Sequence, residues 1–347
     1  MSTTCTAATA AITLTEADLG PYVTHASTCR RPTGPGLPGD TVPFDFAELC
    51  GEGGARPAAY FFHDRPDPMD RRPLAPSLPT LVRFAAVTDE LAGLRGQFAA
   101  RAGRCGTEAA ARATRLLLAV FEEGADGAPA PFRRMAALIR PLALAAGPGT
   151  ASGLALDLPV RLLDREFGRG GVVRFEEVDL PAALTHEPTR RFLCGTGLPE
   201  DGFLFRPDTE LPLRTLTEYY ADERPGEFPA GRLPARADHL IRLGHLVEGG
   251  SPVVDGTTGT VWSWSEPEAV LHPLNTDVST FASTLWLLRR ERAADEEPGH
   301  ALTGEACDRL AMTMIQALSS LDPAGTATDA DWHYWTELFR DEAGGVL

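Results

Sequence analysis

The chain has 347 residues, of which 43% are apolar, and a formal net charge of −16 at neutral pH. This length and composition allow a sizeable core and suggest two domains, or one domain with a long extension. All 32 basic residues are arginine, which excludes a Walker phosphate loop and any catalytic lysine. The strongly acidic balance disfavours nucleic acid and anionic membranes as partners.

The first 57 residues are rich in Gly, Pro, Thr and Ala, and we expect them to form a low-order N-terminal tail. Residues 1–14 lack the charged start of a signal peptide, and no apolar run of the chain reaches about 18 residues. The six cysteines are scattered without a Cys-x-x-Cys spacing, which argues against a zinc site or a disulfide framework. These features predict a cytoplasmic protein.

Residues 58–150 are expected to form a mostly helical unit whose family the sequence does not identify. Residues 58–62 form a short apolar run that predicts a buried strand. A stretch of small residues, 145–153, predicts the end of this unit. Apolar residues at helical spacing predict three helices, on Val87, Leu91, Leu94 and Phe98, on Ala113, Leu117, Val120 and Phe121, and on Met135, Leu138, Ile139 and Leu142.

Residues 155–347 are expected to form a second domain of the α+β class. Helical patterns at 160–168 and 187–193 flank a predicted strand at 171–178. Gly197 has the position of the residue that follows a helix C-cap, and Pro199 prevents the helix from continuing.

The segment 241–264 predicts a small antiparallel meander. Two β-branched runs flank the residues 255–259, whose Asp and Gly residues favour a hairpin turn. Trp262 and Trp264 are two residues apart, so they share one face of a strand. Both tryptophans have two interpretations, as core residues or as anchors of an interface.

The C-terminal part predicts further helices. Asn275 or Thr276 is the expected N-cap of a helix with an apolar stripe on Phe281, Leu285 and Leu288. Asp331 is the expected cap of a last helix that contains Trp335, and its aromatic residues either dock the terminus onto the core or form a contact patch. Another helix is expected on Leu310, Met314, Leu318 and Leu321.

A series of landmarks between residues 189 and 281 resembles a known family. A helix that ends in Phe192 and Leu193 is followed by a Gly-Leu-Pro turn at 197–199. Gly244, the Asp-x-x-x-Gly of residues 255–259 and the Leu-Asn pair at 274–275 then follow in order. In this order and spacing, residues 155–300 resemble the SUKH-4 type of the SUKH superfamily of immunity proteins. The resemblance implies a small antiparallel sheet flanked by helices, and a protein that needs no cofactor and neutralises a cognate toxin by covering its active site.

The charge of the chain suggests the chemistry of such a partner. Residues 1–160 carry 16 acidic and 15 arginine side chains, net −1, whereas residues 161–347 carry 32 and 17, net −15. Acidic surfaces steer basic proteins, and nuclease toxins are basic, although acidity also aids solubility. The oligomeric state cannot be predicted. The expected partner contacts lie between residues 200 and 270, at Asp201, Glu218, Tyr219, Tyr220, Asp222, Glu223, Glu227, Glu248, Trp262, Trp264, Glu266 and Glu268.

Catalytic, cofactor-binding and metal-binding motifs are not recognisable in the sequence. The fold could still bring together two sets of His and Asp residues, although Asp residues in turns and isolated histidines usually have structural roles. Two alternatives to an immunity protein stay open, a hydrolase or nucleotide-processing activity in residues 58–150 and an intracellular scaffold or regulator. The two candidate catalytic sets are His63 with Asp64, Asp67 and Asp70, and His239, His245 and His272 with Asp255 and Asp277.

Overall fold

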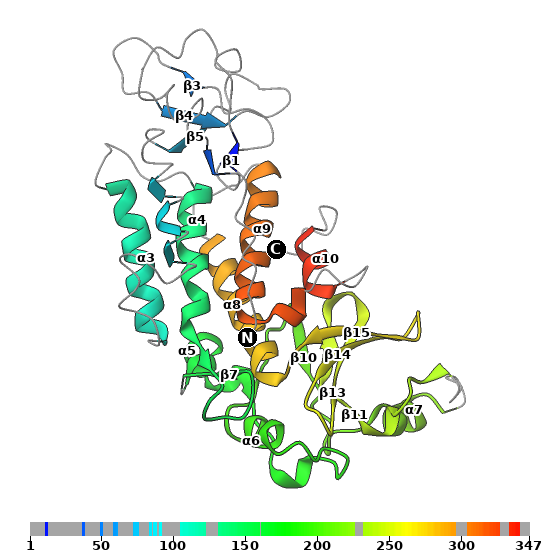
Figure 1. Cartoon of the computed structure of the whole chain (residues 1–347). Helices are drawn as coiled ribbons and strands as arrows, with labels where there is room; N and C mark the ends of the chain where they lie inside the picture. The colour runs from blue at the N-terminus through cyan, green and yellow to red at the C-terminus, as the bar shows by residue number, and fades with distance from the viewer. Residues whose placement is uncertain are drawn as a thin grey trace, which may run out of the picture. The chain divides into compact units, whose positions relative to one another are not determined.

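The structure of the chain is a computed structural model, in which helices and short antiparallel strands form an α+β fold (Figure 1). The chain consists of two compact units, with residues 1–102, 111–141 and 300–307 in unit 1 and residues 103–110, 142–299 and 308–347 in unit 2. The structure describes residues 11–12, 37–38, 49–50, 58–61, 72–75, 83–84, 86–88, 90–91, 105–122, 131–159, 161–225, 232–295, 304–326 and 333–340.

The described part of unit 1 contains short strands as well as helices. Strands β3 (Leu49–Cys50), β4 (Ala58–Phe61) and β5 (Arg72–Ala75) form an antiparallel sheet, and β1 (Ala11–Ile12) pairs with β2 (Leu37–Pro38). The strand predicted at 58–62 is therefore confirmed as β4.

The helices predicted before residue 142 are present in the described residues. Residues 83–84, 86–88 and 90–91 are helical, while Leu94 and Phe98 lie outside the described residues. Helix α3 (Thr107–Glu122) begins in unit 2 and continues into unit 1, and α4 (Pro131–Ile139) leads into the 3₁₀ helix η3 (Arg140–Ala145). The apolar stripes are buried as predicted, at Val87, Leu91, Ala113, Leu117, Val120, Met135 and Ile139.

The largest sheet described in unit 2 is four-stranded and antiparallel, with the strand order β11-β13-β14-β15. Strands β10 and β12 form a separate antiparallel pair, as do β8 and β9, and β6 and β7. This confirms the predicted meander. The strands of unit 2 are β6 (Gly147–Pro148), β7 (Leu156–Asp157), β8 (Val172–Val173), β9 (Leu198–Pro199), β10 (Phe205–Pro207), β11 (Leu240–Arg242), β12 (Gly244–Leu246), β13 (Gly250–Asp255), β14 (Val261–Ser265) and β15 (Val270–Asn275).

The predicted hairpin turn joins β13 to β14. The Asp255 carboxylate accepts hydrogen bonds from the backbone N–H groups of Thr257 at 2.8 Å and Thr258 at 3.1 Å. Gly259 has a φ of 79°, which an L side chain rarely adopts. The Asp and Gly residues therefore supply the turn chemistry that the sequence predicts.

Helices α5 (Leu162–Phe167) and α6 (Glu187–Gly195) confirm the two short helices predicted before residue 195. The strand predicted at 171–178 is wrong beyond β8. Glu176 and Asp179 close a capping box there, in which the Glu176 N–H donates to the Asp179 carboxylate at 2.8 Å, and the chain turns into the 3₁₀ helix η5 (Glu177–Asp179).

Helix α8 (Val278–Asp295) is buried on every face from Val278 to Leu288, not only along the predicted apolar stripe. The prediction that Asn275 or Thr276 caps this helix is wrong. Asp277 is the cap, since its carboxylate accepts hydrogen bonds from the backbone N–H groups of Ser279 at 2.8 Å and Thr280 at 3.2 Å. Asn275 instead ends β15 with a buried side chain.

The last helices are α9 (Gly304–Leu321) and α10 (Tyr334–Arg340), joined through the 3₁₀ helix η9 (Pro323–Thr326). Trp335 of α10 is buried and its ring centroid lies 6.3 Å from that of Phe281, which confirms that it docks onto the core. Asp331, the predicted cap, lies outside the described residues. Within the described ranges, no helix has both the length and the apolar content needed to cross a membrane.

Candidate partner-binding surface

Most of the predicted contact residues gather around helix α7 (Leu216–Glu223), which begins at a capping box. The Thr215 hydroxyl accepts a hydrogen bond from the Glu218 N–H at 3.2 Å, and the Thr215 N–H donates to the Glu218 carboxylate at 2.8 Å. The carboxylate also lies at the positive end of the helix dipole. Glu218 therefore fixes the start of the helix, although the residue is exposed.

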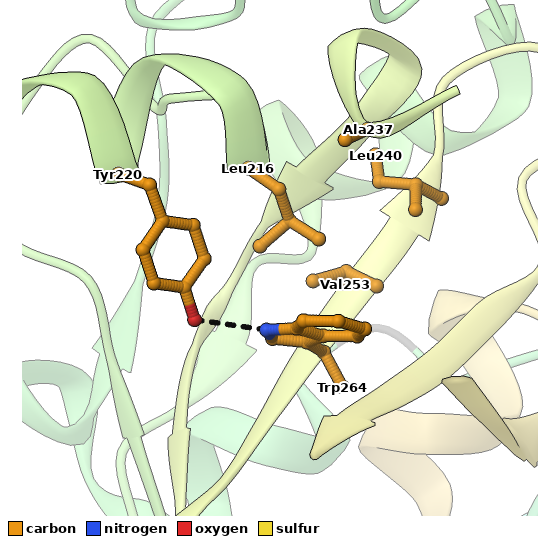
Figure 2. Packing of buried hydrophobic residues seen from close by; sticks show 6 residues of the cluster. All are labelled: Leu216, Tyr220, Ala237, Leu240, Val253 and Trp264. Atoms are coloured by element: carbon orange, nitrogen blue, oxygen red, sulfur yellow. Dashed lines mark hydrogen bonds between the residues drawn. The ribbon is translucent and has the colours of Figure 1, made fainter. Parts of the chain in front are cut away.

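One face of α7 packs onto the sheet. Leu216 and Tyr220 are buried against Val253 and Trp264, from β13 and β14, together with Leu240 and Ala237 (Figure 2). The Trp264 indole N–H donates to the Tyr220 hydroxyl at 2.8 Å, and that hydroxyl donates to the Glu266 carboxylate at 3.1 Å. Both polar groups of this aromatic pair are therefore satisfied inside the domain.

This packing corrects part of the predicted contact set. Tyr220 is 5% exposed and Trp264 is 1% exposed, so they belong to the core and cannot anchor a partner on the surface. Trp262 lies on the same face of β14 as Trp264, as predicted, and is partly buried against the same cluster. The core interpretation of the two tryptophans therefore holds for Trp264.

Tyr219, the next residue to Tyr220, packs against the edge of the same cluster and is partly exposed. The guanidinium carbon of Arg242 lies 4.2 Å from the centroid of the Tyr219 ring, and that of Arg214 lies 5.4 Å from it. Such cation–π contacts hold an aromatic ring in one orientation. Tyr219 is therefore a pre-positioned aromatic side chain at the edge of the surface.

Three carboxylates surround Arg214 at the same place. Arg214 nitrogens lie 2.6 Å from Glu210, 3.0 Å from Glu223 and 3.7 Å from Asp222. Partial burial opposes ionisation, but the Glu223 hydrogen bond and the charges of the three carboxylates raise the pKa of Arg214. One guanidinium cannot neutralise three carboxylates, so the cluster keeps an acidic surplus.

The position of this acidity is unfavourable for the helix itself. Asp222 and Glu223 lie in the last turn of α7, which contains no basic residue. A carboxylate at the negative end of a helix dipole destabilises the helix by roughly 0.3–1 kcal/mol. Stability alone therefore does not explain these two residues. We call the surface formed by Glu210, Arg214, Glu218, Tyr219, Asp222 and Glu223 the α7 face.

A buried ion pair holds Arg242 against the Tyr219 ring of the α7 face. Arg242 of β11 is 2% exposed, and its Nη1 lies 2.6 and 2.5 Å from the two carboxylate oxygens of Asp208. Its Nη2 lies 2.7 and 2.6 Å from the two ring nitrogens of His245. Burial and the Arg242 charge lower the pKa of His245, whose neutral ring accepts the hydrogen bond. Arg242 is thus held where its guanidinium supports the Tyr219 ring.

The remaining predicted contact residues have other surroundings. Asp201 is buried, lies 3.2 Å from Arg292 and is a core residue rather than a surface contact. Glu266 pairs with Arg224 at 2.6 Å, and Glu268 lies 3.2 Å from His272. Glu227 lies outside the described residues, and the side chain of Glu248 is likewise not described.

Sequence reasoning missed two residues of this surface, and also the buried arginine that contacts Tyr219. Glu210 and Arg214 are four residues apart, and an acidic residue four positions before an arginine is a signal for an ion pair. Arg242 gave no such signal, because its partner Asp208 lies 34 positions earlier and meets it only through the pairing of β10, β11, β12 and β13.

The two candidate catalytic sets have different outcomes. Residues 63–70 lie outside the described residues. Three residues of the second set have separate structural roles. Asp255 forms a turn, Asp277 caps α8 and His245 is hydrogen-bonded to Arg242. In the part of the chain that the structure describes, no three His, Cys, Asp or Glu side chains are placed to hold a metal ion.

A comparison with known families agrees with the α+β fold of unit 2. A family model described as SUKH-4 immunity protein matches residues 158–341, more than half of the chain and nearly all of the described part of unit 2 beyond β7. No curated protein and no solved structure matches the chain.

Proposed function

The chain belongs to the SUKH-4 immunity protein family, and we propose that it neutralises a cognate basic toxin by binding it with the α7 face. Membership of the family implies an immunity role in a toxin system and a cognate toxin as partner. The proposal adds the chemistry and the place of the contact. The observation that carries it is the acidic cluster of Glu210, Asp222 and Glu223 around a single guanidinium, beside Tyr219.

The α7 face has the composition of a protein-binding surface. Its carboxylates are exposed, with 72% of the Glu210 and 65% of the Asp222 side chain accessible, so they can meet arginine or lysine side chains of a partner. Tyr219 is an aromatic residue with a fixed orientation, the type that dominates binding energy in interfaces. Electrostatic steering of a basic partner would then raise the association rate constant.

A nuclease is the class of toxin that fits this surface best. Nuclease active sites are basic because they bind phosphate backbones, and an acidic surface competes for the same side chains. Binding over such an active site would block access of nucleic acid without any catalytic residue or cofactor in the immunity protein. The proposal places the protein in the cytoplasm of a bacterial cell, where it would meet the toxin.

The first test is recovery of the partner. The tagged full chain is purified from its source cells at low and at high ionic strength, and bound proteins are identified by mass spectrometry. We expect one basic protein with nuclease activity that is lost at high ionic strength. Recovery of several host proteins without toxic activity would favour a scaffold or regulator instead.

The second test locates the interface. With the recovered toxin, Asp222→Arg combined with Glu223→Arg should lower the association rate constant by about tenfold or more at low salt. Glu187→Arg combined with Glu200→Arg makes the same charge change on exposed residues of α6 and of the segment after β9, and should change the rate by less than about threefold. Equal slowing by both pairs would assign the effect to net charge and remove the α7 face from the proposal.

A further inference from the structure

A cavity of about 630 Å³ opens in unit 2 beside helix α5 and the C-terminal end of α6. Its volume lies in the range of small-molecule sites, about 300–1,000 Å³. The described residues that line it combine apolar side chains with three arginines and one carboxylate: Leu158, Pro159, Arg161, Leu162, Leu163, Asp164, Arg169, Arg174, Gly195 and Thr196.

One of the three arginines is held by groups of the protein. Arg174 Nη2 donates to the Asp164 carboxylate at 2.7 Å, and its Nε donates to the Gly195 carbonyl at 3.0 Å. Asp164 is therefore neutralised, and the carbonyl end of α6 that faces the cavity is capped by a cation. These two contacts remove the groups that would otherwise repel an anion from the cavity.

The other two arginines have no such partner. Among the described residues, neither Arg161 nor Arg169 forms an ion pair or a side-chain hydrogen bond, and both are exposed at the cavity. Residues 161–347 contain 32 acidic side chains against 17 arginines, so carboxylates are in overall excess in this half. Two unpaired guanidinium groups in one cavity are a local reversal of the charge of the domain.

The backbone at Arg161 also holds an uncommon conformation. Its φ is 65° and its ψ is 18°, in the left-handed region that residues other than glycine, asparagine and aspartate seldom occupy. Glycine would relieve this cost, yet the chain has an arginine there. The cost of this backbone conformation therefore suggests that the arginine side chain itself has a role at this position.

We propose that this cavity binds a small organic anion, a phosphate or carboxylate group carried on an apolar body. Arg161 and Arg169 bind the oxyanion, because a guanidinium group can donate two parallel hydrogen bonds to two oxygen atoms of a carboxylate or a phosphate. Leu158 and Pro159 contact the apolar body. The site is separate from the α7 face and does not depend on the proposed toxin.

The test uses phenyl phosphate as the probe and the full chain as the protein, with binding followed by ligand-observed NMR. Phenyl phosphate should bind, whereas phenol, which has the body without the anion, should bind at least about tenfold more weakly. Benzoate in a parallel titration separates a phosphate site from a carboxylate site. Inorganic phosphate tests whether the apolar body contributes.

Two variants assign the binding to the cavity. Arg161→Asn, chosen because asparagine accepts the left-handed backbone, combined with Arg169→Gln should weaken phenyl phosphate binding by about tenfold or more. Arg165→Gln is the control for loss of a nearby guanidinium, since Arg165 is an exposed arginine of α5 that does not line the cavity and forms no ion pair within the described ranges. Circular dichroism confirms that all variants are folded.

The outcomes are separable. Weakening by the double variant with unchanged binding by Arg165→Gln supports the proposal. No binding of phenyl phosphate or benzoate to the wild-type chain would overturn it, as would equal weakening by the control. Binding of a short polyglutamate peptide without binding of either small anion would also overturn it, because the cavity would then be part of a protein interface.

Discussion

The Trp335 indole N–H of helix α10 donates a hydrogen bond to the side-chain carbonyl of Asn275 at 3.1 Å, across 60 positions of the chain. The Asn275 amide in turn donates to the Asp322 carboxylate at 2.9 Å, and that carboxylate also accepts from the Thr276 N–H at 2.8 Å. One buried asparagine thus joins the end of β15 to η9 and α10. The Leu-Asn pair of the family pattern therefore has a structural role.

Asn275→Ala should lower the free energy of unfolding of unit 2 by about 2–3 kcal/mol, because it leaves the Trp335 N–H without its acceptor in the core. All five tryptophans lie between residues 262 and 335, so tryptophan fluorescence during urea unfolding reports on unit 2. Thr217→Ala on the exposed face of α7 is the control and should change the value by less than about 0.5 kcal/mol. Equal effects of the two variants would contradict the role of Asn275.

Two neighbouring glycines should respond in opposite directions to the same substitution. Gly197 has a φ of 83°, and an added Cβ would lie 2.4 Å from the Val173 carbonyl oxygen. Gly195 lies at the end of α6, and an added Cβ meets no atom within 4 Å. Gly197→Ala should therefore destabilise the domain by more than about 1 kcal/mol, and Gly195→Ala should stabilise it by about 0.4–1 kcal/mol. Thermal unfolding of both variants checks the prediction, which fails if Gly197→Ala is neutral.

Local patterns predicted the elements of unit 2 well where one residue type decides the backbone. Gly197 and the turn at Asp255 have the roles that the sequence suggests, because left-handed conformations and turns depend on the residues themselves. The cap of α8 was misplaced by one or two residues because Asn275, Thr276 and Asp277 are all good caps. Only the buried partners Asp322 and Trp335 decide between them, and both are distant in sequence.

The candidate surface was predictable in composition but not in arrangement. Acidic and aromatic residues between positions 200 and 270 do gather around α7. Tyr219 and Tyr220 are adjacent in the sequence, yet Tyr219 is partly exposed and Tyr220 is 5% exposed. The sequence does not show which of the two tyrosines is buried, because this depends on which face of the short helix packs against Trp264.

The Tyr220 hydroxyl should contribute measurably to stability. Tyr220→Phe removes the hydroxyl that accepts the Trp264 N–H hydrogen bond and should cost about 1–2 kcal/mol. Tyr219→Phe is the matched control, because its hydroxyl has no hydrogen bond among the described residues, and it should change stability by less than about 0.5 kcal/mol. Urea unfolding of the two variants gives the comparison. A smaller loss for Tyr220→Phe than for Tyr219→Phe would contradict the geometry.

Alkaline pH tests the same hydroxyl in another way. Burial raises the pKa of Tyr220 from 10.0 to about 12, and the nearby Glu266 charge acts in the same direction. Above pH 10 the unfolded chain loses this proton while the folded chain keeps it, so stability must fall as pH rises toward 12. The chain has no lysine, so fewer groups titrate in this range than in most proteins. Tyr220→Phe should reduce the loss by on the order of 2 kcal/mol. An identical alkaline loss in wild type and variant would refute the shift.

Acidic pH should weaken the support of the α7 face through His245. Burial and the Arg242 charge lower the pKa of this histidine below its ordinary 6.5. As pH falls below 6.5, the unfolded chain binds the proton first, so folding stability decreases until pH reaches the lowered pKa of the folded state. A protonated His245 can no longer accept a hydrogen bond from Arg242, which should also loosen the cation under Tyr219.

His245→Gln should therefore show a smaller loss of stability between pH 7 and pH 5 than the wild type does, because glutamine can accept the Arg242 hydrogen bond at both pH values. His272→Gln removes one histidine at a different site, beside Glu268, and serves as the control for the loss of an imidazole. Urea unfolding at the two pH values, followed by tryptophan fluorescence, measures the difference. If the wild type and His245→Gln lose the same stability on acidification, the pKa of His245 is not lowered by its surroundings and Arg242 does not keep its ring neutral.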